Sequence, residues 1–274
     1  MASDLKEFES PVRRYAPIRI ARDGLAPGER NVAAEVPVSI TYNGLAHAVM
    51  MVTPQDLEDF VVGFSLSEAI IERANEIESM DIREIDGGGY LAVLRVPQER
   101  FKNVALGRRN IVGQSGCGIC GIIELENLVR PARPLGAPPK VSSDTLFKCL
   151  DELRGFQPIN AATGAVHAAA FVKDGEIIAC REDVGRHNAL DKLIGHLARS
   201  GQNAAAGLVL LSSRCSFELV QKTALAGAPM LVTVSAPTTF AVDLAQKLGL
   251  TLIALARSDS MLCFNDPHSF FATS

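Results

Sequence analysis

Three short apolar runs in the second half of the chain constrain its fold more than any other feature. They cover residues 207–212, 230–234 and 250–256. The stretches between them, Ser216–Leu225 and Phe240–Leu248, carry apolar residues at helical spacing. Apolar strands that alternate with helices are typical of parallel strands buried on both faces. The sequence therefore predicts a βαβαβ series whose sheet is covered on both sides.

The residues before this series predict a hairpin and two further helices in the same domain. Lys173-Asp174-Gly175 separates Val166–Phe171 from Glu176–Cys180, as expected for a turn between paired strands. Ser142-Ser143 predicts the cap of a helix that ends at Leu153. A second helix follows the hairpin, with an apolar face formed by Ala189, Leu190, Leu193, Ile194 and Leu197.

A smaller α+β unit is predicted ahead of this domain. Apolar and polar residues alternate between Ala33 and Met51, and Tyr42-Asn43-Gly44 is the expected hairpin turn. Thr53 and Pro54 then predict the start of a helix, with Thr53 as its N-cap. The apolar stripe of this helix is Leu57, Phe60, Val61 and Phe64, and two strands are expected at Met80–Ile85 and Tyr90–Val96.

Local composition divides the chain into four segments. Residues 1–25 lack periodicity and are expected to form a flexible arm. The α+β domain is placed at residues 26–130, with a cysteine-containing loop at its end. Residues 131–140 are expected to be a linker, because four of these ten residues are proline. The second domain takes residues 141–274.

Composition and charge argue against several classes of function. The net charge of −4 is unlike that of a general nucleic-acid binder. No apolar run reaches about 18 residues, so no membrane span is expected. The first ten residues are polar and charged, so no secretory signal is expected. We therefore expect a cytoplasmic protein whose 6 cysteines are thiols or metal ligands rather than disulfides.

The most unusual stretch is residues 113–121, GQSGCGICG, which holds Cys117, Cys120 and four glycines. Glycine leaves the backbone unrestricted and the sulfurs uncovered. A helix is expected directly after the loop, and its N-terminus together with Arg108 and Arg109 would favour thiolate over thiol. An accessible thiolate can attack a persulfide and later release the outer sulfur. The loop is therefore a candidate site of sulfur transfer.

Other chemistry of this cysteine pair stays open. One CxxC pair supplies half of a tetrahedral zinc site, and His167, His187 or Cys215 could complete it. A thioredoxin-like couple fits less well because the loop precedes a proline-rich linker, and a structural disulfide is disfavoured in a reducing compartment. The loop also matches the G-x-G-x-x-G pattern, but the acidic residue needed about 20 positions later would fall in the linker.

A second polar cluster lies at residues 181–192, REDVGRHNALDK, where a strand is expected to turn into a helix. One interpretation is a capped helix start, with Asp183 or Asn188 as the cap and His187 paired with Asp191. The other is a polar binding site, because histidine, arginine, asparagine and aspartate are concentrated at one turn. The sequence leaves both open.

Polar residues also follow the three apolar runs. Ser212-Ser213-Arg214 ends the first run, Ser235 ends the second, and Arg257-Ser258-Asp259-Ser260 ends the third. Ligands of open α/β sheets bind at the carboxyl ends of the strands, and arginine matches phosphate oxygens. We therefore expect an anion or nucleotide pocket here. The alternative is that the serines cap the next helices while the arginines face solvent.

Single residues elsewhere have simpler interpretations. His167 is expected to be a core histidine at the start of a strand. Cys149, Cys180 and Cys263 lie in apolar stretches and are expected to be buried thiols. Cys215 is expected to be more exposed, and it has no assigned role.

Taken together, these motifs make the chain resemble the FdhD family, the sulfurtransferases required for active formate dehydrogenase. The resemblance spans residues 33–257 and is most specific at residues 182–192, EDVGRHNALDK. The other matching segments are TPQDLEDFVVGFSLSE from Thr53 to Glu68, the CGICG loop from Cys117 to Gly121, TGAVH from Thr163 to His167, Ser213-Arg214 with Glu218 and Lys222, and SAPT from Ser235 to Thr238.

The resemblance implies a sulfurtransferase with a persulfide intermediate. A cysteine desulfurase would pass sulfur to Cys117, and Cys120 would assist or share it. The sulfur would then go to a molybdenum bis(molybdopterin guanine dinucleotide) cofactor, bound as a substrate, before that cofactor enters formate dehydrogenase. A homodimer is expected, with no permanent cofactor or metal and with neither nucleic acid nor membrane as a partner.

The resemblance also implies a cofactor-binding segment and a fold. The segment corresponds to Leu255, Ala256, Arg257, Ser258, Asp259 and Ser260, and we expect Arg214, Ser235 and His187 to join it. Asp259 and Ser260 depart from the glycine and the basic residue that family members tend to carry. The expected class is α/β, with a three-layer cytidine-deaminase-like C-terminal domain and a smaller N-terminal α+β domain. The chain lacks the H-x-E motif of zinc deaminases, so their chemistry is not expected.

Three functions compete at this point. The first is covalent sulfur transfer through Cys117. The second is a chaperone that binds and delivers the cofactor without chemistry. The third is a zinc-stabilised module.

Overall fold

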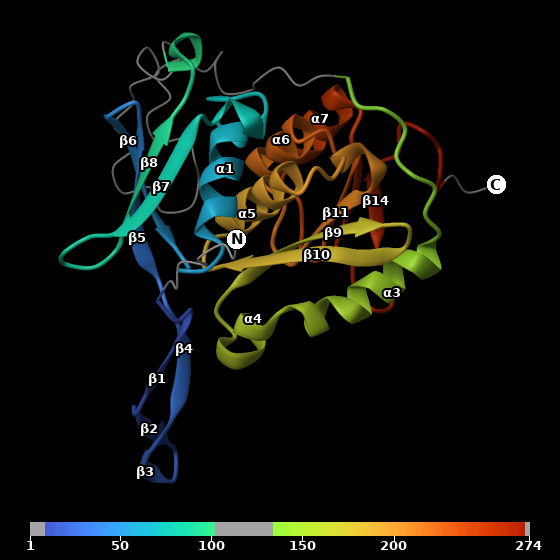
Figure 1. Ribbon diagram of the computed structural model, residues 1–274. Coiled ribbons are helices and arrows are strands. Elements are labelled where there is room, and N and C mark those ends of the chain that lie inside the picture. Colours follow the sequence, from blue (N-terminus) through green and yellow to red (C-terminus); the bar gives the residue numbers. More distant parts are fainter. Residues whose placement is uncertain (1–8, 102–133, 272–274) are drawn as a thin grey trace.

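The computed structural model describes residues 9–101 and 134–271 (Figure 1). They form two β-sheets, the helices that pack on them and a projecting ribbon. The larger sheet has the strand order β10-β9-β11-β12-β13-β14, and the smaller has the order β6-β5-β8-β7. The strands of the larger sheet are β9 (His167–Lys173), β10 (Glu176–Asp183), β11 (Leu208–Leu211), β12 (Met230–Thr233), β13 (Thr251–Ala254) and β14 (Leu262–Asn265). Those of the smaller sheet are β5 (Val36–Tyr42), β6 (Leu45–Val52), β7 (Ser79–Glu84) and β8 (Tyr90–Arg95).

The predicted βαβαβ series is confirmed. Strands β11, β12 and β13 are parallel neighbours, and α6 (Phe217–Leu225) and α7 (Thr239–Leu248) connect them. Both connections cross the sheet in the same direction, so right-handed crossovers place both helices on one face. Gly249 ends α7 in the left-handed conformation, with a φ of 67°. Strands β9, β10 and β14 run antiparallel to their neighbours, which makes the sheet mixed.

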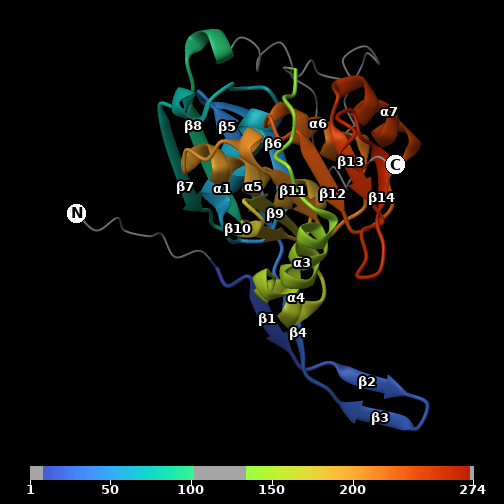
Figure 2. The ribbon, with the colours of Figure 1, turned by 90° about the vertical axis from the view of Figure 1, so that its right-hand side faces the viewer.

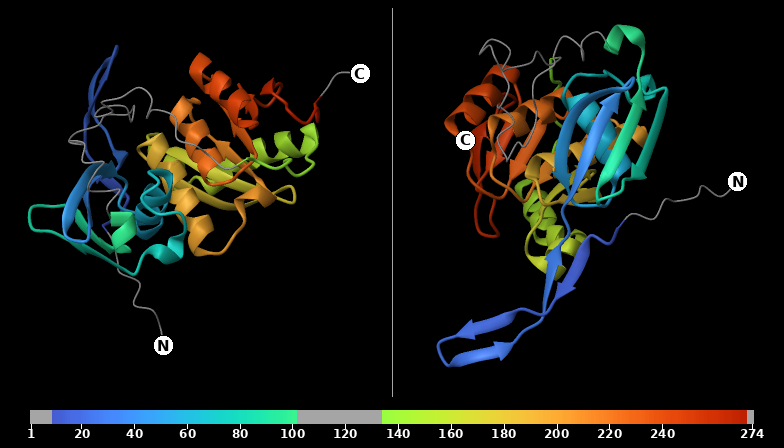
Figure 3. Two further views of the ribbon diagram at one scale, coloured as in Figure 1. Left: turned by 90° about the horizontal axis from the view of Figure 1, so that it is seen from above. Right: turned by 90° about the vertical axis from the view of Figure 1, so that its left-hand side faces the viewer.

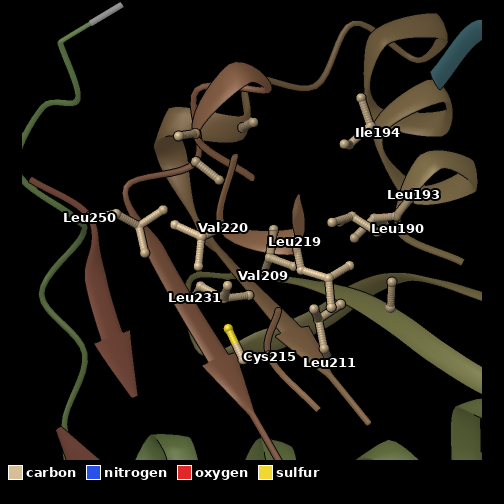
Figure 4. Packing of buried hydrophobic residues seen from close by; sticks show 14 of the residues in the cluster. Leu190, Leu193, Ile194, Val209, Leu211, Cys215, Leu219, Val220, Leu231 and Leu250 are labelled. Atoms are coloured by element: carbon tan, nitrogen blue, oxygen red, sulfur yellow. The ribbon is translucent and has the colours of Figure 1, made fainter. Parts of the chain in front are cut away.

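The larger sheet is the middle of three layers (Figures 1 and 2). One face packs on α5 (Arg186–Arg199), α6 and α7, and Figure 4 shows Leu190, Leu219 and Leu231 among the buried side chains of this layer. The other face packs on α3 (Ser143–Leu153). This arrangement agrees with the expected α/β class, whereas the narrower likeness to the cytidine-deaminase fold stays a prediction.

Both predicted hairpins are confirmed, and both have a two-residue turn that ends in glycine. Asn43 and Gly44 join β5 to β6 with φ values of 49° and 83°. Asp174 and Gly175 join β9 to β10 with φ values of 52° and 80°. Two successive residues with positive φ define the hairpin turn that matches strand twist, and asparagine, aspartate and glycine tolerate this conformation best.

Helix α1 (Leu57–Ser67) packs its apolar stripe against the smaller sheet. Leu57, Phe60, Val61 and Phe64 are all buried there, as the spacing predicts. The predicted N-cap is wrong, because α1 begins after Asp56 and Thr53 lies outside the helix. Thr53 is fully buried, and its amide donates to Asp183 Oδ2 at 2.9 Å. Thr53 therefore joins the two domains instead of capping a helix.

The first described residues form paired strands rather than the loose arm expected at residues 1–25. Strands β1 (Val12–Tyr15) and β4 (Arg30–Ala33) pair with each other, and β2 (Ile18–Ala21) pairs with β3 (Gly24–Pro27). We call residues 12–33 the ribbon. It projects away from both sheets in every view (Figures 1 to 3). At its base the guanidinium of Arg30 donates to the backbone oxygen of Thr163 at 2.5 Å.

Residues 134–140, within the expected linker, take neither helix nor strand. The following helix α3 is capped as predicted, since Ser142 Oγ accepts from the Thr145 amide at 3.1 Å. The remaining short elements are α4 (Pro158–Thr163) and the 3₁₀ turns η1 (Ala74–Glu76), η3 (Arg154–Phe156) and η4 (Ala204–Ala206). Among the described residues, every helix is too short or too polar to cross a bilayer.

The two domains meet where α1 crosses α5 at a pair of glycines. A Cβ atom on Gly63 would lie 1.7 Å from the carbonyl oxygen of Asp191. On the opposite helix, a Cβ on Gly195 would lie 1.8 Å from the carbonyl oxygen of Asp59. Side chains do not tolerate such distances, so the backbones touch directly. The two glycines fix the separation of α1 and α5, and with it the position of the smaller sheet.

We predict that Gly63→Ala lowers the free energy of unfolding by about 2–3 kcal/mol, because the added methyl group forces the helices apart. The loss should exceed the gain of about 1 kcal/mol in helix propensity that alanine brings. Gly155→Ala is the control, since no atom lies within 4 Å of a Cβ at that position. Urea denaturation measures both variants. Equal stabilities would contradict the close-packed crossing.

Candidate functional site

The three strand ends singled out by the sequence meet at one edge of the larger sheet. The amide of Ser235, after β12, donates to the Ser213 oxygen after β11 at 3.4 Å. The amide of Leu255, after β13, donates to the Ser235 oxygen at 3.2 Å. The amide of Cys215 donates to the Ala236 oxygen at 3.1 Å. We call this margin the carboxyl edge, because the parallel strands β11, β12 and β13 all end there.

The start of β9 and the start of α5 lie at the same edge. Ala168 exchanges two hydrogen bonds with Ser212: its amide donates to Ser212 Oγ at 2.8 Å, and its oxygen accepts from the Ser212 amide at 3.0 Å. His167 precedes it and pairs in register with Asp183, the last residue of β10. His187, in the first turn of α5, lies 3.3 Å from Ser216 Oγ at the start of α6.

The carboxyl edge is electropositive around His167. Burial lowers the pKa of His167, and the charges of Arg186, Arg214 and His187 act in the same direction, while Asp183 opposes them. The N-terminus of α5 adds to this field through the helix dipole, and its N-cap, Gly185, carries no side chain that could cap the first turn. His167 is therefore half-buried in a cationic cluster, a setting that the expectation of a plain core histidine did not anticipate.

A carboxylate balances part of this charge. Glu218 Oε2 lies 3.5 Å from His187 Nε2. Burial alone raises the pKa of Glu218, but hydrogen bonds from His187 and Ser216 outweigh it, and the net pKa lies below the ordinary value. The side chains of His187, Ser216 and Glu218 thus form a local polar cluster beside Arg214. Such a cluster can orient the imidazole toward a ligand.

The segment expected to bind the cofactor is only partly directed to this edge. Leu255 has a φ of 51°, and Ala256 is buried in the core on the α3 side of the sheet. The following residues are exposed, and the Arg257 amide donates to the Ser260 oxygen at 2.8 Å, closing a tight turn. The exposed members, Arg257, Ser258, Asp259 and Ser260, are therefore the ones with side chains free to meet a ligand.

The two predicted catalytic residues, Cys117 and Cys120, lie outside the described residues, so the structure does not test their role. Two other thiol expectations were wrong. Cys263 on β14 is exposed. Cys215 is fully buried, and Figure 4 shows its sulfur among the apolar side chains of the core. Burial raises the pKa of Cys215 to about 12.

The burial of Cys215 bears on the zinc interpretation. A thiol must be ionised to bind zinc, and this one is held in its neutral form. Within residues 9–101 and 134–271, no three or more His, Cys, Asp or Glu side chains form a group that could hold a metal ion. The described residues therefore give the zinc interpretation no support.

The cluster at residues 181–192 is mainly structural, but not in the way a simple capped helix would be. Asp183 and Lys192 are both fully buried and form an ion pair at 2.7 Å. Lys192 also donates to the backbone oxygens of Thr53 and Glu182. Asp183 accepts from the side chain of Asn188, whose Nδ2 also donates to the Met51 oxygen at 2.8 Å. These contacts fasten the β6–α1 segment onto α5.

The expected pair of His187 with Asp191 is wrong. Asp191 is buried and pairs with Lys222 of α6 at 2.6 Å, while Ser67 at the end of α1 donates to it at 2.6 Å. His187 turns to Ser216 and Glu218 instead. Both residues face α6, but Asp191 lies one turn further along and is held there by Lys222 and Ser67, partners that the sequence spacing alone does not reveal.

Glu182 has a further structural role. Its two carboxylate oxygens accept from the amides of Ile159 and Asn160 at 2.9 and 2.8 Å, in the first turn of α4. A carboxylate at a helix N-terminus satisfies amides that have no partner within the helix. Of the REDVGRHNALDK run, only Arg186 and His187 thus belong to the cationic cluster at the carboxyl edge.

Sequence reasoning missed two members of this cluster, His167 and Arg186. The sequence signal that could have found them is that each lies next to the end of a predicted strand, as Arg214 does. The sequence does not show that antiparallel β9 and β10 lie next to β11, so only the tertiary structure brings these residues together.

The model of the FdhD/NarQ family matches residues 33–271. The chain belongs to the FdhD/NarQ family. The matched range includes both sheets, the α1–α5 crossing and the whole carboxyl edge.

FdhD/NarQ relatives with close sequences are named sulfur carrier protein FdhD. The protein from Xanthomonas euvesicatoria pv. vesicatoria is 46% identical over 237 residues, which cover 86% of this chain and 84% of the relative. The one from Xanthomonas campestris pv. campestris is 43% identical over 263 residues, covering 94% and 93%. The one from Cupriavidus necator is 44% identical over 244 residues, covering 89% and 84%.

A solved structure shares the FdhD/NarQ fold. It comes from Desulfotalea psychrophila and is described as a formate dehydrogenase accessory protein. The TM-score is 0.72 at 24% identity, covering 94% of this chain and 99% of the other. At this identity the likeness demonstrates the common fold.

We predict that Lys192→Met lowers the free energy of unfolding by about 3–5 kcal/mol, because it leaves the Asp183 carboxylate buried and uncompensated. Lys148→Met is the matched control, since Lys148 is half exposed and pairs with Glu152 at 3.8 Å on the surface. Its effect should stay within about 0.5 kcal/mol. The double variant Asp183→Asn/Lys192→Met should lose less than the sum of its single variants. Additive losses in urea denaturation would contradict a coupled pair.

We also predict that Arg214→Gln raises the pKa of His167, because it removes one of the positive charges that disfavour the imidazolium. The measurement is an NMR titration of the 5 histidine side chains, with His167→Gln used to assign the signal. Arg154→Gln, which changes an exposed arginine in η3, should leave the His167 titration where it is. An unchanged pKa of His167 in Arg214→Gln would show that the Arg214 guanidinium is too far away to influence the imidazole.

Proposed function

We propose that this chain is a sulfur carrier that serves formate dehydrogenase. The observation that carries the proposal is its 46% identity, over 86% of the chain, to a protein named sulfur carrier protein FdhD. The fold it shares with a formate dehydrogenase accessory protein is consistent with this client. A cysteine desulfurase is the proposed sulfur donor, and the cytoplasm is the proposed location.

Cys117 is the proposed acceptor, with Cys120 assisting or sharing the sulfur. The Cys117 thiolate attacks the outer sulfur of a persulfide on the desulfurase. A new S–S bond forms at Cys117, the S–S bond of the donor breaks, and the donor cysteine leaves as a thiolate. One sulfane sulfur atom moves from donor to acceptor, so the step needs no external oxidant or reductant. The support for this step is the composition of the GQSGCGICG loop and the family membership.

The proposed recipient is the molybdenum bis(molybdopterin guanine dinucleotide) cofactor, bound as a substrate. Its phosphate groups need cationic and hydrogen-bonding partners. The carboxyl edge offers the guanidinium groups of Arg214 and Arg186, the imidazoles of His167 and His187 as hydrogen-bonding partners, and the N-terminus of α5. The residues present therefore suit an anionic ligand.

Residues of the neighbouring strand ends complete the proposed site. Ser235 and Arg257 follow β12 and β13 at the same edge. Of the segment Leu255–Ser260, we propose Arg257 as the charged contact, with Ser258 and Ser260 as hydroxyl donors. Asp259 would favour a position away from the phosphates. We further propose that the domain of the larger sheet is cytidine-deaminase-like, which the three layers support.

We predict that Cys117→Ala lowers sulfur loading at least about tenfold when the protein is incubated with a cysteine desulfurase and cysteine. Intact mass spectrometry measures the gain of a sulfur atom. Cys263→Ala is the matched control, because it removes an exposed thiol elsewhere in the chain and should leave loading unchanged. Equal loading of Cys117→Ala and wild type would show that Cys117 is not the carrier.

A binding chaperone is the second candidate, because the cationic carboxyl edge could hold an anionic cofactor without any covalent step. Complementation of a strain that lacks the endogenous protein separates the two functions. A chaperone would still activate formate dehydrogenase after Cys117→Ala and Cys120→Ala are combined. A covalent carrier would lose that activity while Arg214-dependent binding of the cofactor persists.

A further inference from the structure

A histidine accepts a hydrogen bond from an arginine where β10 meets α1 and α5. Arg181 of β10 donates through Nε to Asp59 Oδ2 at 2.8 Å and through Nη1 to the Cys180 oxygen at 2.9 Å. Its Nη2 lies 2.6 Å from Nδ1 of His196. A guanidinium can only donate hydrogen bonds, so the imidazole must accept this one. His196 is therefore neutral in this arrangement, with its proton on Nε2.

This contact joins the two domains where α1 lies beside α5 (Figure 1). Asp59 belongs to α1, Arg181 to β10 and His196 to α5. The second oxygen of Asp59 accepts from Arg199, also on α5, at 2.5 Å. Asp59 is buried, and burial of a carboxylate is unfavourable unless its oxygens are paired. We call these four side chains the latch, because they hold α1 against α5 and the larger sheet.

Two opposing influences act on the charge of His196. Burial and the positive charges of Arg181 and Arg199 disfavour the imidazolium, whereas the carboxylates of Asp59 and Asp56 favour it. The first influence is the stronger, so the pKa of His196 lies below its ordinary value. Other charged side chains on α5 and on the elements packed against it pair with partners of their own, namely Glu58 with Arg199, Glu76 with Arg100, Asp191 with Lys222, Asp183 with Lys192 and Glu218 with His187.

We propose that the latch is an acid-sensitive contact between the two domains, closed while His196 is neutral and released when it is protonated. Protonation places a hydrogen on Nδ1, where it meets the N–H of Arg181, so the hydrogen bond between these side chains breaks. The new N–H competes with Arg181 for Asp59 Oδ2, which lies 3.5 Å from Nδ1. Acid therefore weakens the attachment of α1 to α5 and β10. The proposal is independent of the proposed sulfur chemistry.

The direction of the pH effect follows from the position of the His196 pKa. Histidine in an unfolded chain has a pKa of about 6.5, and that of His196 is lower in the folded protein. The unfolded chain therefore binds this proton more readily than the folded one. Stability from the latch is fully present above about pH 6.5 and is lost as the pH falls through the folded-state pKa.

Hydrogen exchange of the α1 amides tests the latch on the full-length chain, at about pH 7.5 and about pH 5, with correction for the intrinsic exchange rate. On acidification, protection of α1 should fall at least about threefold more in the wild type than in His196→Gln. The reason is that the glutamine oxygen accepts from Arg181 at either pH. His268→Gln is the matched control, since it removes an exposed histidine outside the latch and should keep the wild-type response.

An NMR titration gives a second measurement that needs no stable variant, because it is made on the wild type. The His196 signal should titrate below the ordinary pKa of histidine. Arg181→Gln should raise the pKa of His196, because it removes the nearest positive charge. A wild-type pKa at or above about 6.5, an equal acid response in His196→Gln and wild type, or loss of that response in His268→Gln would each overturn the proposal.

Discussion

The direct backbone contact between α1 and α5 is the constraint on which the rest of the structure depends. At Gly63 and Gly195 the helices approach so closely that a single methyl group on either would meet a carbonyl oxygen. Helix α1 carries the smaller sheet on its apolar stripe, and α5 covers the larger sheet. The crossing therefore sets the relation of the two sheets. Around it, the buried Asp59 carboxylate of α1 accepts from Arg199 of α5 and from Arg181 of β10, which ties α1 to both α5 and the larger sheet.

Two buried ion pairs make this junction specific. Asp183–Lys192 and Asp191–Lys222 are each surrounded by further hydrogen bonds from the neighbouring domain or helix. A buried pair contributes little net stability unless its geometry is good and its remaining hydrogen bonds are satisfied. Here these conditions are met by Thr53 in the first case and by Ser67 in the second. The polar residues of α5 thus select one arrangement of the domains, while apolar burial supplies most of the driving force.

The carboxyl edge of the larger sheet gathers positively charged residues from several elements. Because β9 is antiparallel to β11, the start of β9 reaches the ends of the parallel strands and brings His167 next to Arg214. The N-terminus of α5 completes the cluster with Arg186 and His187. The base of the ribbon lies close by, through Arg30 and α4.

From β5 to β13, sequence patterns by themselves determined the strands, the longer helices and the hairpin turns, because apolar period and turn chemistry are local properties. The βαβαβ series, the turns at Asn43-Gly44 and Asp174-Gly175, and the meeting of Ser213, Ser235 and Leu255 at one edge all followed from them. Tertiary structure alone decided the partners of Thr53, Asp183, Asp191 and His187, and the burial of Cys215. These partners lie far away in sequence, about 130 residues for Asp183 and Thr53. A local pattern shows that a residue is polar or apolar, but only the packing of distant elements decides what it meets.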